Sequence, residues 1–232
     1  MSTPRRPGRR ALVRSARRLG VLGAVAALTV TLAQSTTTAA FTAQTGDTGN
    51  RATTATTFCT SPGTTTPALT ATMDTAVYQA NPNTNYGTGT SIGIGSANLA
   101  NAYSYVKFDL TAAPIPARCT ITSATLSIRA STPMAGATIE VYRANAAWNL
   151  TMTWNTGRVG FTGTPSSTAS LSAAGVQTWD VTTLTRELYA GTNNGFALKD
   201  SVDNAGSARY QTWDSMESGT AANRPKLSIT WG

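Results

Sequence analysis

The chain has 232 residues, a formal net charge of +8, two cysteines and no histidine. Without histidine, the sequence excludes Ser-His-Asp and Cys-His nucleophile pairs, and it excludes histidine-ligated zinc or copper. Two cysteines alone cannot complete a structural zinc site. Charged residues make up 12% of the chain, too few for a coiled coil, whereas hydrophobic residues make up 41%, enough for a packed core.

The positive charge is concentrated at the start of the chain. Seven of the 18 lysines and arginines lie in residues 1–18, and no acidic residue precedes Asp47. Beyond residue 40 the chain carries 11 positive and 10 negative charges, a net of +1. Because nucleic-acid binding normally needs a clustered basic surface, this balance argues against nucleic acid as a partner.

Residues 1–40 are predicted to be a secretory signal peptide. A basic stretch is followed by an uncharged, mostly apolar run over residues 19–32 and then by small residues that end at Ala40, the order typical of an export signal. The apolar run is shorter than the roughly 20 residues that a bilayer span needs; an uncleaved membrane anchor is the alternative. We therefore expect a secreted, extracellular protein with the cell wall as a candidate location, and no membrane partner after cleavage.

Residues 41–67 form a threonine-rich segment that we expect to be a linker. Fourteen of residues 41–75 are threonine, and such a segment buries too little apolar surface to offset the entropy lost on ordering. Because oxidising compartments favour disulfides, export predicts a bridge between the two cysteines, Cys59 and Cys119. This bridge would tie the linker to the domain that follows.

From residue 68 onward, short alternating segments indicate β-strands. Alternation of apolar and polar residues places the apolar side chains of each segment on one face, which is the pattern of a half-buried strand. The predicted strands cover residues 103–110, 123–129, 138–142, 195–199 and 225–231, with turns rich in Pro, Asn and Gly between them.

One segment departs from this alternation and predicts a helix. Val181, Leu184 and Leu188 recur at helical spacing, Asp180 can cap the start, and Gly191 can cap the end. Many short strands and one short helix predict an all-β fold for residues 68–232, a jelly-roll-like antiparallel β-sandwich.

The order of these segments resembles a known domain family. The pieces that carry the likeness are, in chain order, residues 74–78, 85–87, 105–110, 121–126, 141–142, Trp148 with residues 153–155, and residues 179–183, 194–196 and 224–227. They are similar to the DNRLRE domain, also classed as carbohydrate-binding module family 96, over residues 70–231. Two stretches depart from the family pattern: residues 149–152 lack its usual Glu, and residues 210–217 follow its Ser-Arg-Glu-like pattern only loosely.

The resemblance implies a jelly-roll β-sandwich on a secreted or cell-surface protein. It further implies that the partner is a polysaccharide, which in some members is acidic, such as alginate. The sequence favours binding over catalysis, because a glycosidase needs two carboxyl groups facing each other across a sugar bond. Asp214 and Glu217 are close in sequence, but a nearby pair on one loop is more often a solvated turn. We therefore expect a non-catalytic carbohydrate-binding module.

The candidate sugar-binding residues are aromatic and basic side chains that we expect to point outward. Tyr103, Tyr105 and Lys107 alternate on one face of a strand, and aromatic rings stack on the faces of pyranose sugars. Arg129 and Arg143 would join them if their strands belong to the same sheet, and guanidinium groups suit the carboxylates of uronic acids. The alternative is that the tyrosines are ordinary strand residues, covered by a loop or paired across strands.

The tryptophans divide into two groups. Trp213 lies in a polar stretch and is a further candidate for an exposed sugar-binding ring. Trp148, Trp154 and Trp179 belong to the pieces that carry the family resemblance, and we expect them in the core.

No cofactor is expected, and calcium is the one ion that we consider. Asp200, Asp203 and Asn204 lie in one glycine-containing loop and offer the hard oxygen ligands that calcium prefers. The alternative is an ordinary turn rich in Asp and Asn. The competing class of function is a structural or adhesive surface protein without a sugar site, in which a bare sheet edge or an apolar patch would serve assembly.

Overall fold

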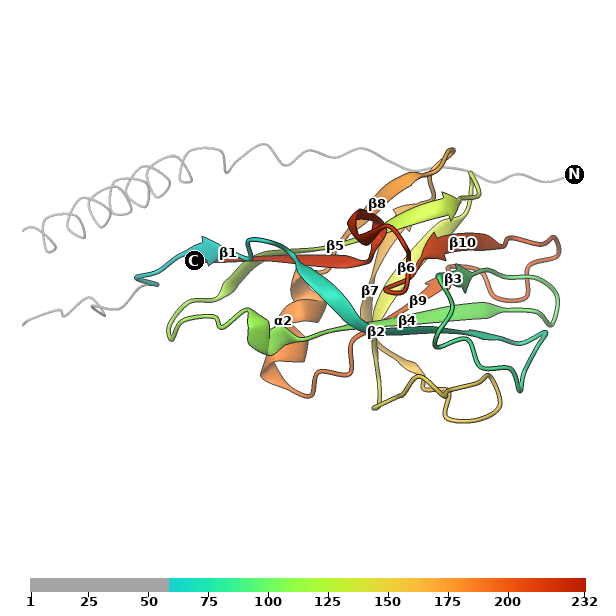
Figure 1. The fold of residues 1–232 in the computed structure, drawn as a ribbon, viewed down its shortest axis with the longest axis horizontal. Helices are drawn as coiled ribbons and strands as arrows, with labels where there is room; N and C mark the ends of the chain where they lie inside the picture. Colours follow the sequence, from blue (N-terminus) through green and yellow to red (C-terminus); the bar gives the residue numbers. More distant parts are fainter. Residues whose placement is uncertain (1–58) are drawn as a thin grey trace, which may run out of the picture. The chain divides into compact units, whose positions relative to one another are not determined.

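Two antiparallel β-sheets packed face to face make up the part of the chain that the structure describes (Figure 1). The structure is a computed structural model, and it describes residues 59–232. The all-β sandwich predicted from the sequence is confirmed. The predicted signal peptide and the predicted linker up to residue 58 lie outside the described residues.

The first sheet is organised around β5. One edge of β5 pairs with β8, and the other edge pairs with β11 along its first half and with β10 along its second half. β3 continues the sheet beyond β10, and β1 pairs with the end of β11. The strands are β1 (Gly63–Thr64), β3 (Ser91–Ile94), β5 (Ile121–Thr132), β8 (Gly175–Asp180), β10 (Gln211–Asp214) and β11 (Lys226–Trp231).

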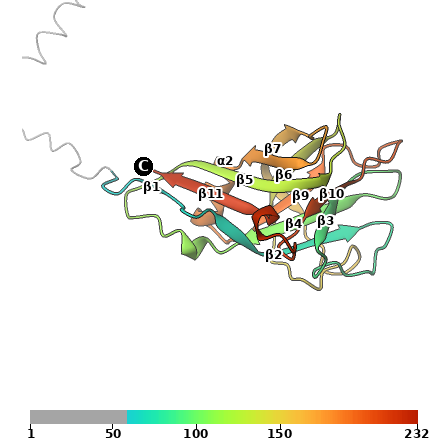
Figure 2. The same ribbon diagram turned by 45° about the horizontal axis from the view of Figure 1, so that its top comes forward.

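The second sheet has the strand order β2-β4-β9-β6-β7, with every neighbouring pair antiparallel. Its strands are β2 (Leu69–Tyr78), β4 (Ala102–Phe108), β6 (Thr138–Ala144), β7 (Phe161–Ala169) and β9 (Phe196–Asp200). β2 joins the two sheets, because its first residues pair with β11 and the rest pair with β4. Figure 1 shows β2 crossing from one sheet to the other, and Figure 2 shows β5 and β11 side by side.

Alternation along the strands builds the core between the sheets. In β5, Leu126 and Ile128 point inward and are buried, and they meet Phe196 and Leu198 of β9 in the same apolar cluster. Full burial of one such side chain contributes about 1.5–3 kcal/mol to folding. The five predicted strands correspond to β4, β5, β6, β9 and β11.

The predicted helix is α2 (Thr182–Ala190), which buries Leu184 and Leu188 against the sandwich. Asp180 Oδ1 accepts the N–H of Thr182 at 2.9 Å, and the N–H of Gly191 donates to the carbonyl of Glu187. Gly191 is the C-cap, as predicted, whereas the N-cap is Val181 and makes no side-chain cap hydrogen bond, so Asp180 holds the first helical N–H from one residue further upstream. Two 3₁₀ turns, Leu110–Ala112 and Ala221–Asn223, complete the helical elements of residues 59–232. No helix within these residues is long and apolar enough to span a membrane.

The predicted disulfide is confirmed, because Cys59 and Cys119 are bonded. Cys59 precedes β1, and Cys119 lies just before β5. The bridge therefore fastens the chain that enters the sandwich to the strand at the centre of the first sheet.

Candidate functional site

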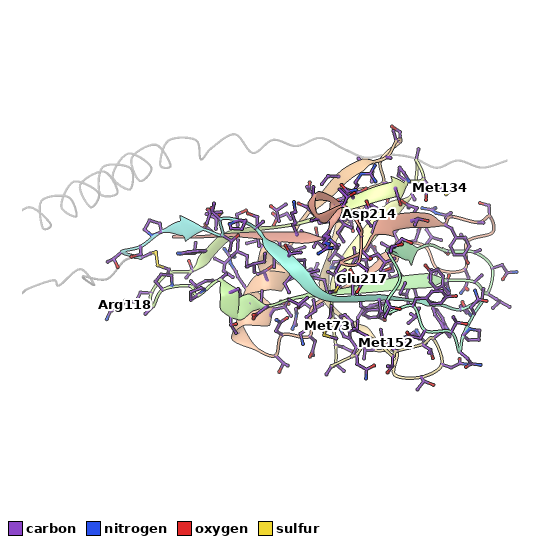
Figure 3. The ribbon with its side chains drawn as sticks, viewed as in Figure 1. Met73, Arg118, Met134, Met152, Asp214 and Glu217 are labelled. Atoms are coloured by element: carbon purple, nitrogen blue, oxygen red, sulfur yellow. A yellow bond between two sulfur atoms is a disulfide. The ribbon has the colours of Figure 1, made fainter. Side chains whose placement is uncertain are left out.

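A loop covers the outward face of the second sheet. This loop, residues 145–160 between β6 and β7, contributes Trp148 and Met152 to a second apolar cluster, separate from the core between the sheets. Figure 3 labels Met152 in this loop. On the sheet side, the cluster contains Tyr103 and Tyr105 of β4. The loop and the outer face of the second sheet therefore enclose a second, smaller hydrophobic core.

Tyr103 and Tyr105 point away from the main core, as the alternation predicts, but they are buried. Their exposed fractions are 6% and 0%. Each hydroxyl is already used, since Tyr105 donates to the carbonyl of Val159 at 2.6 Å and Tyr103 donates to Asp203 Oδ1 at 3.1 Å. Burial raises the pKa of both phenols, that of Tyr103 to about 12. The structure therefore matches the alternative in which a loop covers the tyrosines.

An exposed cation lies over the aromatic edge of this cluster. The guanidinium carbon of Arg158 is 4.2 Å from the centre of the Trp154 ring and 5.9 Å from the centre of the Tyr103 ring. The rings of Tyr103 and Trp154 are 5.0 Å apart. Arg158 is exposed and Trp154 is half-buried. We call Tyr103, Trp154, Arg158 and the neighbouring Asn155 the Arg158 surface.

A tight turn within the loop sets the geometry of the Arg158 surface. The N–H of Thr153 donates to the carbonyl of Thr156 at 2.9 Å, and the N–H of Thr156 donates back to Thr153 Oγ1 at 3.0 Å. Gly157 follows with φ +75°, a left-handed conformation that favours glycine. Arg158 Nε then donates to the carbonyl of Trp154 at 3.2 Å. The turn thus directs the guanidinium back over the tryptophan ring.

The polar groups around this surface are suited to sugar hydroxyls. Asn155 Nδ2 donates to Asn83 Oδ1 at 3.0 Å, and both side chains are exposed. Lys199 and Asp203 form an ion pair of 2.6 Å on the side of Tyr103. No carboxylate within residues 59–232 lies within 4.0 Å of the Arg158 guanidinium. Its charge is therefore available to an acidic ligand.

The predicted basic partners lie elsewhere. Arg129 is on β5 in the other sheet, where it pairs with Asp214 at 3.1 Å. Arg143 is on β6, on the same side of the strand as the inward-facing Ile139 and Val141, and its side chain pairs with Glu187 of α2 at 2.6 Å. Lys107 shares the outward face of β4 with Tyr105 and is half-buried. Only Lys107 therefore lies on the same face of the sheet as the tyrosines.

Trp213 is not exposed, which corrects the expectation from its polar sequence neighbours. It is fully buried and packs against Trp179 with ring centres 5.5 Å apart. The reason is that β10 belongs to the first sheet and its alternation directs Trp213 toward the core between the two sheets. Trp148 and Trp179 are buried as predicted, whereas Trp154 reaches the surface.

The oxygens considered for calcium have other partners. Asp200 is buried and its carboxylate pairs with Arg209 at 3.0 Å. Asp203 pairs with Lys199, and the side chain of Asn204 bonds to the facing loop of residues 95–101. No group of three or more potential metal-binding side chains is found within residues 59–232. The contacts are those of a cross-linked Asp/Asn turn.

A second basic surface lies where α2 meets the chain before β5. It is a groove of about 620 Å³ whose lining includes Arg118, Arg186, Tyr189 and Ile115, and no acidic residue. Arg186 Nε donates to the carbonyl of Ile121 at 2.7 Å, which holds this side chain against the groove. We call this feature the basic groove. The sequence did not reveal it, because its two arginines come from segments 68 positions apart in the numbering.

The carboxyl groups of Asp214 and Glu217, which are close in sequence, have different partners. Asp214 is held by Arg129, whereas the half-buried Glu217 contacts Asp74, which is 1% exposed. A glycosidase needs two carboxyl groups that face each other across a bound sugar bond, and neither of these two contacts has that arrangement.

Comparison with known proteins agrees with the fold. Residues 65–231 match the model of carbohydrate-binding module family 96, and no curated protein matches the sequence. The matched residues run from just after β1 to the last residue of β11 and therefore include both sheets of the sandwich. The chain belongs to carbohydrate-binding module family 96.

Proposed function

We propose that the protein is a secreted, non-catalytic module that binds an acidic polysaccharide at the cell wall or in the extracellular matrix. Membership of a carbohydrate-binding family supports a sugar partner. The basic and then apolar order of residues 1–32, followed by small residues, supports export. The near-neutral composition beyond residue 40 favours local recognition by a few basic groups over a broad basic field.

The single observation that supports an acidic ligand is the position of Arg158 over Trp154. A pyranose ring packs on the exposed part of an aromatic face, and a guanidinium next to that face donates two parallel hydrogen bonds to a carboxylate. Arg158 has no carboxylate partner within the described residues. Asn155 follows Trp154 in the chain, and its side-chain amide and that of Asn83, to which it is bonded, suit the hydroxyls of a neighbouring sugar unit.

Affinity electrophoresis through gels containing alginate, pectin or a neutral glucan tests this proposal. We expect the wild-type protein to be retarded by the acidic gels and the Arg158→Ala and Trp154→Ala variants to migrate faster. Arg186→Ala is the matched control, because it removes a surface guanidinium from the basic groove. If Arg186→Ala loses retardation and Arg158→Ala keeps it, the Arg158 surface is the wrong site.

The non-catalytic part of the proposal has its own measurement. Incubation of the protein with the same glycans should release no new reducing ends. Steady release that scales with protein concentration, and that persists after repurification, would overturn a binding-only role.

A further inference from the structure

The buried carboxyl group of Asp74 lies against the half-buried side chain of Glu217. Asp74 lies on β2 on the opposite side of the strand from Met73 and is 1% exposed. Its Oδ2 accepts the N–H of Met216 at 2.6 Å, which brings Glu217, the next residue, beside it. Figure 3 labels Glu217 beside β2. The Oε2 atom of Glu217 is buried and has no donor among the described residues.

No cation neutralises this pair. No lysine or arginine nitrogen within residues 59–232 lies within 4.0 Å of either carboxyl group. The elements packed around β2 are β4, β3, β11 and the segment that carries Glu217. The ionisable side chains of β4 face the opposite side of the sheet, and β3 has no ionisable side chain. On β11, Lys226 points away from the core. Arg224, just before β11, donates to the carbonyl of Ser218 instead.

Two ionised carboxylates in contact and out of water repel each other strongly, so one of them retains a proton. Burial is the main cause that raises the pKa of Asp74 to about 7, and the charge of Glu217 adds to it, although the bond from Met216 opposes the shift. A proton between the two groups also supplies the donor that Glu217 Oε2 otherwise lacks.

We propose that Asp74 and Glu217 share one proton and act as a pH-sensitive latch, which fastens the segment between β10 and β11 to β2. The same segment is anchored at its start, where Ser215 Oγ donates to the carbonyl of Gly89 at 2.7 Å. With the proton in place, the latch holds residues 215–218 against β2. Loss of the proton leaves two negative charges in contact, that of Asp74 fully buried, and the segment opens. This device is independent of the sugar-binding proposal.

Carboxyl-carbon NMR on protein labelled at its aspartate and glutamate side chains tests the latch directly. We expect one aspartate signal to titrate near neutral pH, and we expect this signal to disappear in Asp74→Asn. Glu140→Gln is the control, because Glu140 is on the outward face of the second sheet. Titration of every carboxyl group below about pH 5 would overturn the proposal. A signal that moves on addition of calcium at pH 8 would also overturn it, since a cation would then replace the proton.

Hydrogen exchange measures the opening itself. After correction for the intrinsic exchange rate, the Met216 amide of the wild type should exchange up to about tenfold faster per unit of pH above neutrality. In Asp74→Asn, the amide oxygen can accept from Met216 and the amide nitrogen can donate to Glu217, so the corrected rate should be flat with pH. In Glu217→Gln, the amide nitrogen of the new side chain can donate to Asp74. This variant replaces Asp74→Asn in the experiment if Asp74→Asn does not fold. Equal pH dependence in the wild type and in either folded variant would contradict the latch.

Discussion

The guanidinium of Arg158 lies 4.2 Å from the centre of the Trp154 ring, which places a cation that has no carboxylate partner among residues 59–232 on the edge of a buried aromatic cluster. The turn between the two residues is held by reciprocal hydrogen bonds between Thr153 and Thr156. The planar group is thus positioned before a ligand arrives, which lowers the entropy cost of binding.

Replacement of Arg158 should separate the effect of its planar guanidinium group from the effect of its charge. Arg158→Lys keeps the charge but loses the planar fork, so we expect it to bind an acidic polysaccharide more weakly than the wild type and more strongly than Arg158→Ala. A hydrogen bond to a charged group contributes about 1.5–3 kcal/mol, so Arg158→Ala should lower the affinity by about 10- to 150-fold. Calorimetry with a defined uronate oligosaccharide measures it, and equal affinities for all three proteins would contradict the role of Arg158.

Tyr105 should stabilise the fold through its buried hydroxyl. In Tyr105→Phe the half-buried carbonyl of Val159 loses its donor, at a cost of about 0.5–1.5 kcal/mol. Tyr105→Ala should cost more, about 3–5 kcal/mol, because it also empties the space beneath Trp148. Urea unfolding followed by tryptophan fluorescence measures both losses. If Tyr105→Phe is as stable as the wild type but fails to bind sugar, the phenol is a ligand contact and our assignment to the small core is wrong.

The bond between Cys59 and Cys119 should stabilise the sandwich through the unfolded chain. It joins residues 60 positions apart, and in the chain-entropy model a loop of this size contributes about 3–4 kcal/mol. The Cys59→Ser, Cys119→Ser double variant should therefore melt well below the oxidised wild type. Its melting temperature should equal that of the reduced wild type, which is the control. Identical melting of the oxidised and reduced wild type would refute a stabilising role.

Asp180 should make the protein less stable in acid. Hydrogen bonds from the hydroxyl and then the N–H of Thr182 hold the pKa of Asp180 below its ordinary value. Because the folded state holds the carboxylate more tightly in its charged form, this stability is present above about pH 4 and is lost as the pH falls through the lowered pKa. Asp180→Ala should cost about 0.5–2 kcal/mol at pH 7 and less near pH 2.

Thermal melts of the wild type and Asp180→Ala from pH 2 to pH 7 measure this convergence. Thr183→Ala is the matched control, since Thr183 is an exposed neighbour that makes none of these hydrogen bonds. A difference between Asp180→Ala and the wild type that stays constant over the whole range would show that the charge of Asp180 plays no part.

The candidate site illustrates how far sequence patterns extend. Alternation along β4 correctly placed Tyr103 and Tyr105 on the outward face, but it carried no information on residues 145–160, which fold over that face. The spacing of Trp154 and Arg158, four positions apart in a polar stretch, was the one local signal of their contact. The contact between Asp74 and Glu217 had no local signal, because 143 positions separate them in the numbering.

The sequence by itself determined the periodic and covalent features of this protein: alternating strands, one helix with its C-cap, and a single pair of cysteines. These features depend on residues a few positions apart or, for the two cysteines, on a pairing with one possible answer. Only the tertiary structure decided which side chains reach solvent. Trp213 is buried because the second sheet covers the face of β10 that carries it, and the charge of Arg143 is neutralised by Glu187, 44 positions away in the chain. Exposure is set by which distant segments pack together, and that is a property of the whole chain.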